Sequence, residues 1–243
     1  VEFHLCETYI NKGDANLKLI REGKTKTVFE TEDGNFLLRF KDDVTGSGDV
    51  VDPGANEVIG KIEGKGNASL KLSKYFFAIL KSRGIRTHYI DADLEANTML
   101  VKRAETFGDG LEFICRLKAA GSFVRRYGKY VKEGRPLDYL VEITLKDDQA
   151  GDPLINKESL VQLGLMAEEE VGEAVNLTKT ITKIVEEECR RFGLELLDIK
   201  FEFGRVDGEI AVIDEISGDN MRVLKDGKPV FQKELCEIIT GNA

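Results

Sequence analysis

Three charged side chains share one face of an otherwise apolar strand within residues 194–222. Side chains alternate along a strand, so Asp198, Lys200 and Glu202 point to one side while the intervening isoleucine and phenylalanine side chains point to the other. Burying an ion is costly unless it is paired or bound to a metal. This charged face is therefore a candidate site, and the alternative for such a pattern is an exposed, salt-bridged hairpin.

Asp207-Gly208 follows that strand and predicts a hairpin, with residues 209–214 as the returning strand. The loop length decides which side chains meet. A three-residue loop would place Glu202 opposite Asp214 on one face of the ribbon, whereas a two-residue loop would put them on opposite faces. The first arrangement would bring together two carboxylates of the kind that hold Mg²⁺ with nucleotide phosphates.

Net charge and composition limit the classes of ligand. The 243-residue chain has a formal charge of -9, which argues against a general nucleic-acid-binding surface. Its 42% apolar content can build the core of one large domain or two modest ones. No run of 18 apolar residues occurs, and the first ten residues lack the regions of a signal peptide, so we expect a cytoplasmic protein with no membrane association.

Cysteine and histidine offer little material for a zinc or acid–base site. The four cysteines, Cys6 among them, form no CxxC pair, and only His4 and His88 supply imidazoles. Cys189 falls on the apolar stripe of an expected helix. We therefore expect it to pack in the core rather than to act as a nucleophile.

The first half of the chain is expected to be mainly β-structure with one helix. Short strands fill residues 17–40, a helix spans 67–83, and further strands lie at 86–90 and 98–102. Residues 42–66 contain six glycines and one proline. They predict a long loop, which is a candidate lid or ligand-binding loop.

The second half contains a long predicted helix at 167–192, with acidic residues at its start, basic residues at its end and a glycine after it. The polar segment 103–110 contains two glycines and is the best candidate for a boundary between lobes. We therefore predict two lobes, residues 1–103 and 104–243.

The segment Gly23-Lys24-Thr25-Lys26 lies between two apolar strand segments. Alternation puts both lysines on the same side of the chain, where two ammonium groups can clamp phosphate oxygens. The segment is not a Walker loop, which has a longer glycine-rich turn before its lysine. Taken alone, an ordinary solvated hairpin is the simpler explanation.

Nine segments resemble the SAICAR synthetase family of purine biosynthesis, in the family's order and at about its spacing. They are REGKTKTVFE, LLRFKDD, IEGKG, GIRTHYI, MLVKR, CRLKAAGSFVRRYG, LKDDQAGDPLIN, LLDIKFEFG and DEISGDNMR. LLDIKFEFG, at residues 196–204, resembles a family signature in full. The resemblance covers nearly the whole chain, and so many matches in series make it specific.

The resemblance implies an α+β, two-lobed fold with antiparallel sheets and flanking helices, similar to protein kinases and ATP-grasp ligases. It places ATP binding on lobe 1–103, and the substrate and magnesium site on lobe 104–243. The implied activity is that of an ATP-dependent carbon–nitrogen ligase. Such an enzyme activates the carboxylate of carboxyaminoimidazole ribonucleotide (CAIR), joins it to the amine of L-aspartate, and releases ADP and phosphate. A homodimer is the implied assembly.

The residues that match the family's ATP and magnesium site are Lys24, Lys26, Val101, Lys102, Glu202 and Asp214. By this resemblance the first two lysines hold ATP phosphates, and Val101 and Lys102 lie in the linker whose backbone meets adenine. The two carboxylates are the implied Mg²⁺ ligands, and that match favours the three-residue hairpin loop.

The residues that match the family's substrate side are Arg116, Ser122, Asp198, Lys200, Asp219 and Arg222. Arg116 and Ser122 would hold the ribonucleotide, with the glycine before Ser122 letting the backbone approach its phosphate. By the resemblance Asp198, Lys200 and Arg222 line the substrate, and we assign them as the catalytic residues.

Several positions depart from the family pattern. Gly218 stands where proline is common, and no tryptophan follows Arg222. Leu117 and Lys118 replace the usual residues, and the sequence ends at Ala243 where family members generally continue with another helix. These differences lie on the substrate side, so they bear on aspartate and ribonucleotide contacts rather than on ATP.

Two rival functions remain open at this point. A kinase-like phosphotransferase would share the lobed layout, but the HRD and DFG motifs of protein kinases are absent from the sequence. A non-catalytic, ATP-binding regulatory relative would bind ATP without turnover.

Overall fold

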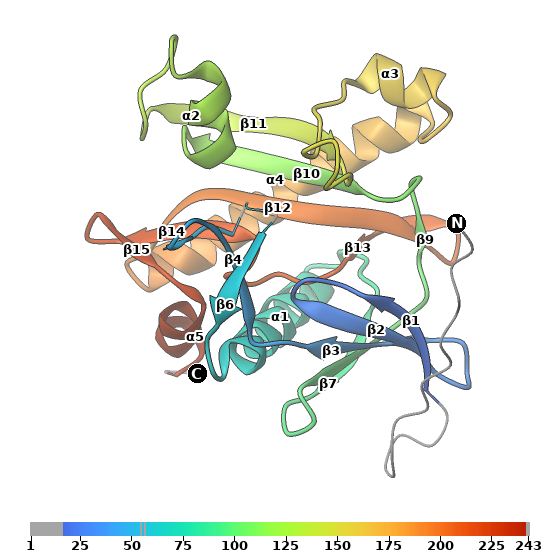
Figure 1. Cartoon of the computed structure of the whole chain (residues 1–243). Coiled ribbons are helices and arrows are strands. Elements are labelled where there is room, and N and C mark those ends of the chain that lie inside the picture. The colour runs from blue at the N-terminus through green and yellow to red at the C-terminus, as the bar shows by residue number, and fades with distance from the viewer. Residues whose placement is uncertain (1–16, 54, 56, 242–243) are drawn as a thin grey trace.

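A computed structural model describes residues 17–53, 55 and 57–241, so His4 and Cys6 lie outside the described residues. Three antiparallel sheets and flanking helices build the described chain (Figure 1). The expected α+β fold is confirmed. None of the described helices is both long and apolar enough to cross a membrane.

The first sheet has five strands in the order β1-β2-β3-β8-β7. They are β1 (Lys18–Glu22), β2 (Lys26–Glu30), β3 (Phe36–Phe40), β7 (Tyr89–Asp93) and β8 (Thr98–Val101). The strands expected at 17–40 and 98–102 are confirmed. The strand predicted at 86–90 begins later, because Thr87 forms a parallel bridge with Val212 of the second sheet instead.

Residues 43–51 and 57–61 form a small sheet and a helix begins at Lys65, so the prediction of a long loop over residues 42–66 was wrong. Its strands are β4 (Asp43–Ser47), β5 (Val50–Val51) and β6 (Glu57–Lys61), in the order β5-β4-β6. Gly48 has φ 59°, in the left-handed region that a tight hairpin uses. A Cβ at Gly46 would collide with the backbone oxygen of Val50. Glycine in this segment therefore allows two strands to approach closely and does not indicate an unstructured loop.

The second sheet has seven strands, in the order β11-β10-β12-β14-β15, with β13 and β9 also paired to β12. They are β9 (Glu105–Thr106), β10 (Leu111–Lys118), β11 (Pro136–Leu145), β12 (Glu195–Val206), β13 (Glu209–Ile213), β14 (Met221–Lys225) and β15 (Lys228–Val230). The central strand β12 carries the charged face of the sequence, and Ile199, Phe201 and Phe203 on its other face are buried. That division of the two faces is confirmed.

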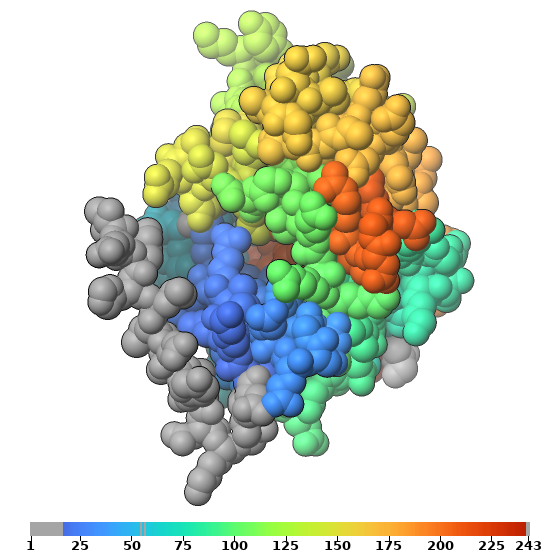
Figure 2. Space-filling model, turned by 90° about the vertical axis from the view of Figure 1, so that its right-hand side faces the viewer, coloured from blue at the N-terminus to red at the C-terminus, as the bar shows by residue number. Residues whose placement is uncertain are grey.

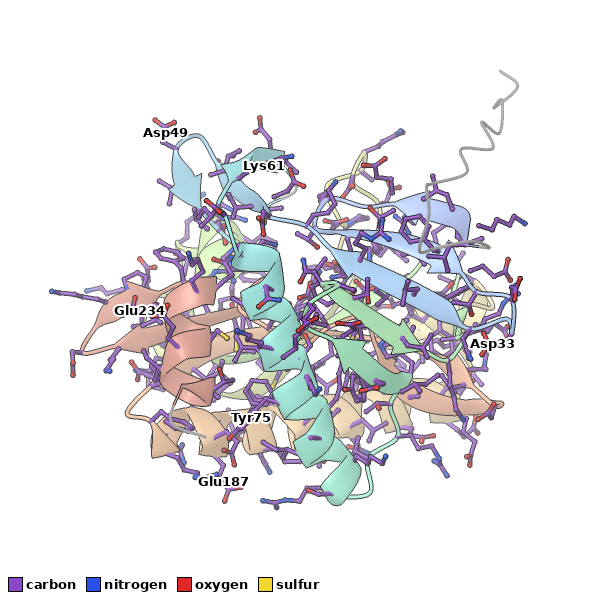
Figure 3. The ribbon with its side chains drawn as sticks, turned by 90° about the horizontal axis from the view of Figure 1, so that it is seen from below. Asp33, Asp49, Lys61, Tyr75, Glu187 and Glu234 are labelled. Atoms are coloured by element: carbon purple, nitrogen blue, oxygen red, sulfur yellow. The ribbon has the colours of Figure 1, made fainter. Side chains whose placement is uncertain are left out.

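Five helices flank the sheets in the described chain. They are α1 (Lys65–Ser82), α2 (Gly121–Tyr127), α3 (Lys157–Gln162), α4 (Glu168–Arg191) and α5 (Gln232–Thr240). The helices expected at 67–83 and 167–192 are thus confirmed as α1 and α4. Seen from below, α1 lies between α5 and the first sheet (Figure 3). The Tyr75 hydroxyl donates to Glu188 at 2.9 Å and ties α1 to α4.

A single hydrophobic core runs through both halves of the chain, from Leu38 to Ile239. The chain leaves the first sheet after Val101 and joins the second at Glu105, close to the expected lobe boundary. Because the core is continuous, the division at residue 103 stays a prediction. Cys189 is buried in this core, and burial raises the pKa of its thiol to about 12, so it stays protonated.

Candidate functional site

Two cavities lie between the sheets and meet at the charged face of β12. The first, of about 560 Å³, is lined by the start of β2, the end of β8 and the residues after β13. The second, of about 550 Å³, is lined by β10, α2, β14 and the β4-β5-β6 sheet. Glu112 and Lys200 line both cavities. Figure 2 shows the first cavity as a hollow between the blue N-terminal strands and the green segment near residue 105.

The β12–β13 hairpin has a two-residue loop, so the three-residue loop favoured by the sequence was wrong. Val206 pairs with Glu209, and Glu202 pairs with Ile213 rather than with Asp214. The loop residue Asp207 has φ 55°, and Gly208 after it is also left-handed, as a tight hairpin turn requires.

Asp214 nevertheless reaches the same cavity as Glu202. Strict alternation would separate them, but Asp214 follows the end of β13 and has φ 65°, which redirects the chain. Its backbone oxygen lies 3.0 Å from Nε2 of His88. A strained aspartate, rather than the hairpin register, therefore brings the second carboxylate into the cavity.

Lysine side chains pair with both of these carboxylates. Lys26 lies 3.0 Å from Asp214, and Lys146 lies 2.6 Å from Glu202. Burial alone would raise the pKa of Asp214, but the charges of Lys26, Lys146 and Lys200 outweigh it and hold that pKa well below its usual range. The site thus pairs acceptor oxygens with cations, as a site for a magnesium–phosphate group requires.

Lys24 and Lys26 both line the first cavity, which agrees with their expected placement on one side of the chain. Lys26 is largely buried, whereas Lys24 lies in the turn before β2 and pairs with Asp148 at 2.6 Å. Their role toward phosphate stays a prediction. Val101 and Lys102 line the same cavity, and the Lys102 backbone N–H donates to the His88 oxygen, so any backbone contact to adenine must use other groups of this linker.

The register of β12 explains the cluster on the substrate side. Asp198 pairs with Arg116 of β10 on one side and with Arg222 of β14 on the other. Its carboxylate accepts from Arg116 at 2.8 Å and from Arg222 at 2.9 Å. Arg116 also donates to the Ser122 hydroxyl at 2.9 Å. These four residues meet in the second cavity, and their role toward a substrate stays a prediction.

Asp219 lies elsewhere. It lines the first cavity and not the second, in contrast to its predicted place with the other substrate residues. Its carboxylate accepts from Lys65 at 2.8 Å and from Ser69 at 2.7 Å on α1, and from Gln232 at 3.1 Å on α5. A Cβ on Gly218 would come within 2.9 Å of the Gln232 Cα, so this glycine allows α5 to approach Asp219 closely.

Several site residues were not singled out from the sequence. They are Asp52, Lys65, Glu112, Lys146 and Glu215. Lys65, Lys146 and Glu215 fall within quoted motifs, namely IEGKG, LKDDQAGDPLIN and DEISGDNMR. Membership of those motifs was the sequence signal that could have identified these three residues. Asp52 has no such context, yet its carboxylate pairs with Arg222 at 2.5 Å.

Lys200 and Glu112 form an ion pair where the cavities meet, with Lys200 Nζ 2.6 Å from Glu112 Oε1. Glu112 pairs directly with Glu202 across β10 and β12, and like charges in such positions repel. Lys146 and Lys200 offset that repulsion. Burial would lower the pKa of Lys200, but Glu112, Glu202 and Asp214 raise it overall, so its amine is charged.

The carboxylates of this site fit a magnesium ion only together with nucleotide phosphates. Within the described ranges, no three His, Cys, Asp or Glu side chains are arranged to hold a metal by themselves. Glu202 and Asp214 are two hard oxygen ligands in one cavity with lysines suited to phosphates. Mg²⁺ is commonly bound by one or two carboxylates together with nucleotide phosphates, and this pair fits that pattern.

Comparison with known proteins gives consistent matches. The family model described as SAICAR synthetase matches residues 19–236. The phosphoribosylaminoimidazole-succinocarboxamide synthase of Clostridium tetani is 53% identical over 92% of this chain and 99% of its own length. The protein of that name from Aquifex aeolicus is 39% identical over 85% of this chain and 92% of its own.

Solved structures agree with these sequence matches. A SAICAR synthetase in complex with ADP superposes with a TM-score of 0.82 at 28% identity, covering 93% of this chain and 98% of that one. The SAICAR synthetase of Pyrococcus horikoshii OT3 gives a TM-score of 0.75 at 27% identity, with the same coverage.

Proposed function

Because the chain belongs to the SAICAR synthetase family, we propose that it joins CAIR to L-aspartate in an ATP-dependent reaction that yields SAICAR, ADP and phosphate. The observation that carries this proposal is the position of Lys200. Its charged amine lies where the two cavities meet. The first cavity is lined by lysines and carboxylates suited to a magnesium–phosphate group, and the second by arginines paired with Asp198. A phosphoryl donor and a carboxylate acceptor could approach each other at this point.

The first cavity would hold the nucleotide. Lys24 and Lys26 would contact the phosphates, and Val101 and Lys102 would lie beside adenine. Glu202 and Asp214 would hold Mg²⁺, which supplies charge neutralisation on the phosphates when bound. The ADP present in a related SAICAR synthetase supports nucleotide binding by this fold.

The second cavity would hold the ribonucleotide. Arg116 and Arg222 are oriented by Asp198, and Arg116 by Ser122 as well, so their guanidinium groups have fixed directions. Fixed cations can bind an anionic substrate without losing much side-chain freedom. Asp219 is held by side chains of α1 and α5 and would contact ligands in the nucleotide cavity, near the point where the two cavities meet.

Two substitution steps, each forming one bond and breaking another, complete the reaction. A carboxylate oxygen of the ribonucleotide attacks the γ-phosphorus and ADP leaves, giving an acyl phosphate. The aspartate amine then attacks the acyl carbon, loses a proton, and expels phosphate that carries the former carboxylate oxygen. Lys200 stabilises the negative charge that moves between these groups, and positioning supplies most of the rate.

The proposal is tested by incubating the protein with ATP, Mg²⁺, CAIR and L-aspartate and measuring ADP and SAICAR. We expect ADP release only when both co-substrates are present, with one SAICAR formed per ADP. ADP release that ignores aspartate would favour a kinase-like phosphotransferase. ATP binding without any ADP release would favour a regulatory relative.

Assembly and location belong to the same proposal. By analogy with the family, we expect a homodimer in the cytoplasm, acting on small molecules without nucleic acid or membrane. Sedimentation analysis of the purified protein tests the assembly, with a mass near twice the 27.1 kDa of one chain as the expected result.

A further inference from the structure

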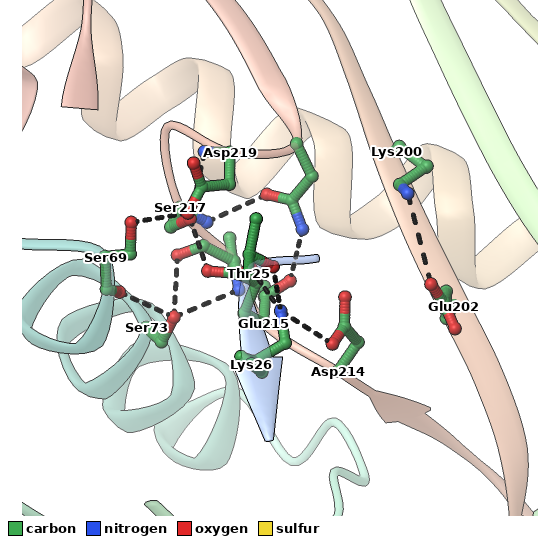
Figure 4. A network of polar contacts seen from close by, with 12 residues as sticks. Thr25, Lys26, Ser69, Ser73, Lys200, Glu202, Asp214, Glu215, Ser217 and Asp219 are labelled. Carbon is green, nitrogen blue, oxygen red and sulfur yellow. Dashed lines mark hydrogen bonds and ion pairs between the residues drawn. The ribbon is translucent and has the colours of Figure 1, made fainter. Parts of the chain in front are cut away.

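Two consecutive carboxylates contact the same ammonium group (Figure 4). Lys26 Nζ lies 3.0 Å from Oδ1 of Asp214 and donates a hydrogen bond to Oε1 of Glu215. Neighbouring residues of an extended chain point to opposite sides. The φ of 65° at Asp214 breaks that rule and turns both carboxylates toward Lys26. A non-glycine residue in this conformation is strained, and such strain clusters at functional sites.

The two carboxylates differ in how freely they can move. The Asp214 side chain is 20% exposed, whereas that of Glu215 is 2% exposed. Both oxygens of Glu215 have partners, because Oε2 accepts a hydrogen bond from the Ser217 hydroxyl at 2.6 Å. Asp214 can therefore turn toward a ligand in the cavity, and Glu215 cannot.

The backbone around Glu215 is also fixed from several directions. Its carbonyl oxygen accepts from the Asn220 amide at 2.6 Å. The next residue, Ile216, donates its N–H to the Ser73 hydroxyl of α1 at 3.3 Å. Burial raises the pKa of Glu215, and the Lys26 ammonium counters that shift. Glu215 is thus a rigid partner for a lysine that reaches in from the first sheet.

We propose that Glu215 is a positioning residue, which holds Lys26 toward the ATP phosphates and leaves Asp214 available to the divalent cation. The inference rests on the proposed function of this site, in which Lys26 contacts phosphate and Asp214 binds the metal. If Glu215 were absent, Asp214 would be the one remaining carboxylate of these two to pair with the Lys26 ammonium. The lysine and the cation would then compete for one carboxylate.

A double-mutant cycle tests this inference without relying on turnover. ATP affinity is measured by calorimetry, with and without Mg²⁺, for the wild type, Glu215→Gln, Lys26→Met and the double variant. We expect Glu215→Gln to weaken Mg²⁺–ATP binding about tenfold, as for loss of one charge-assisted hydrogen bond. In the Lys26→Met background the same change should cost less than about twofold, because residues that act as a unit are not additive.

Two further variants keep the test decisive. Glu209→Gln is the matched control, because Glu209 lies on the same hairpin but is 57% exposed and pairs with Arg86. It should leave ATP affinity unchanged. Ser217→Ala keeps the Glu215 charge and frees one oxygen, and we expect ATP to bind about threefold more weakly. It serves as the measured variant if Glu215→Gln does not fold.

Two results would overturn the inference. One is ATP affinity equal to wild type in Glu215→Gln, or in Ser217→Ala if that is the variant measured. The other is an equal loss in the presence and absence of Lys26, which would indicate a purely structural role. CAIR binding, measured in parallel, should not change. A wild type that shows this coupling but makes no SAICAR would contradict the proposed function and not the positioning role.

Discussion

The guanidinium of Arg222 lies against the backbone of Gly121, where a Cβ would come within 2.6 Å of the arginine Cζ. Gly121 also has φ 53°, which side-chain-bearing residues rarely adopt. The sequence suggested that this glycine lets the backbone approach a phosphate. The structure shows that it makes room for the arginine, and the approach to a phosphate stays a prediction.

Gly121→Ala should therefore displace Arg222 and weaken the ribonucleotide site. We expect the KM for CAIR to rise about tenfold or more, as for loss of one charged contact, while the KM for ATP stays within about twofold. Steady-state kinetics with each substrate varied in turn measure this. Gly134→Ala is the control, because that glycine is also left-handed but a Cβ there meets open space. A rise in the KM for ATP alone would contradict the assignment of the second cavity.

Lys146→Met should impair the nucleotide site. Lys146 neutralises Glu202, which pairs with Glu112 on the adjacent strand. Its loss therefore leaves a buried and a largely buried carboxylate side by side and poorly compensated. We expect kcat/KM for ATP to fall about 10- to 100-fold. The control is Lys157→Met, which removes an exposed lysine paired with Glu168 and should have no effect. Wild-type kinetics in Lys146→Met would show that Lys146 is dispensable.

Asp214→Asn should abolish turnover, because it removes one of the two proposed metal charges and weakens the pairing with Lys26. We expect kcat to fall at least about 100-fold and the Mg²⁺ concentration for half-maximal activity to rise. Titration of activity with Mg²⁺ at saturating ATP measures both. Near wild-type activity would mean that the hairpin carboxylates are structural.

His88 should make stability depend on pH. Burial lowers its pKa to about 4, below the usual value near 6.5, so the unfolded chain binds more protons between these values. The free energy of unfolding should then decrease as the pH falls from 7 toward 5, with His88 contributing about 2 kcal/mol of that decrease. Urea denaturation at both pH values, compared between wild type and His88→Gln, measures this. An equal decrease in both proteins would contradict a buried neutral imidazole.

The sequence predicted the elements that follow from periodicity. The helices α1 and α4 and the buried face of β12 lie where apolar spacing placed them. The strands within residues 42–66 were not predicted. A high glycine content is typical both of flexible loops and of strands that approach each other closely. The distinction depends on neighbours such as Val50, which a linear pattern does not provide.

The site was predictable where a register or a motif fixes it. Asp198 between Arg116 and Arg222 follows from strand pairing, and the motif match marked all three residues. The place of Asp214 could not be derived, because it depends on one left-handed residue rather than on the hairpin register. Asp52 was missed because its partner Arg222 lies 170 positions away.

The fate of one carboxylate oxygen atom tests the proposed ligase reaction. CAIR labelled with ¹⁸O in its carboxylate is incubated with ATP, Mg²⁺ and L-aspartate, and the released phosphate is analysed by mass spectrometry. We expect that each SAICAR formed is accompanied by one phosphate carrying one ¹⁸O, and that no labelled phosphate forms without aspartate. Phosphate that carries no label while ADP accumulates would show that the γ-phosphoryl group goes to water or another acceptor, and would contradict the ligase assignment.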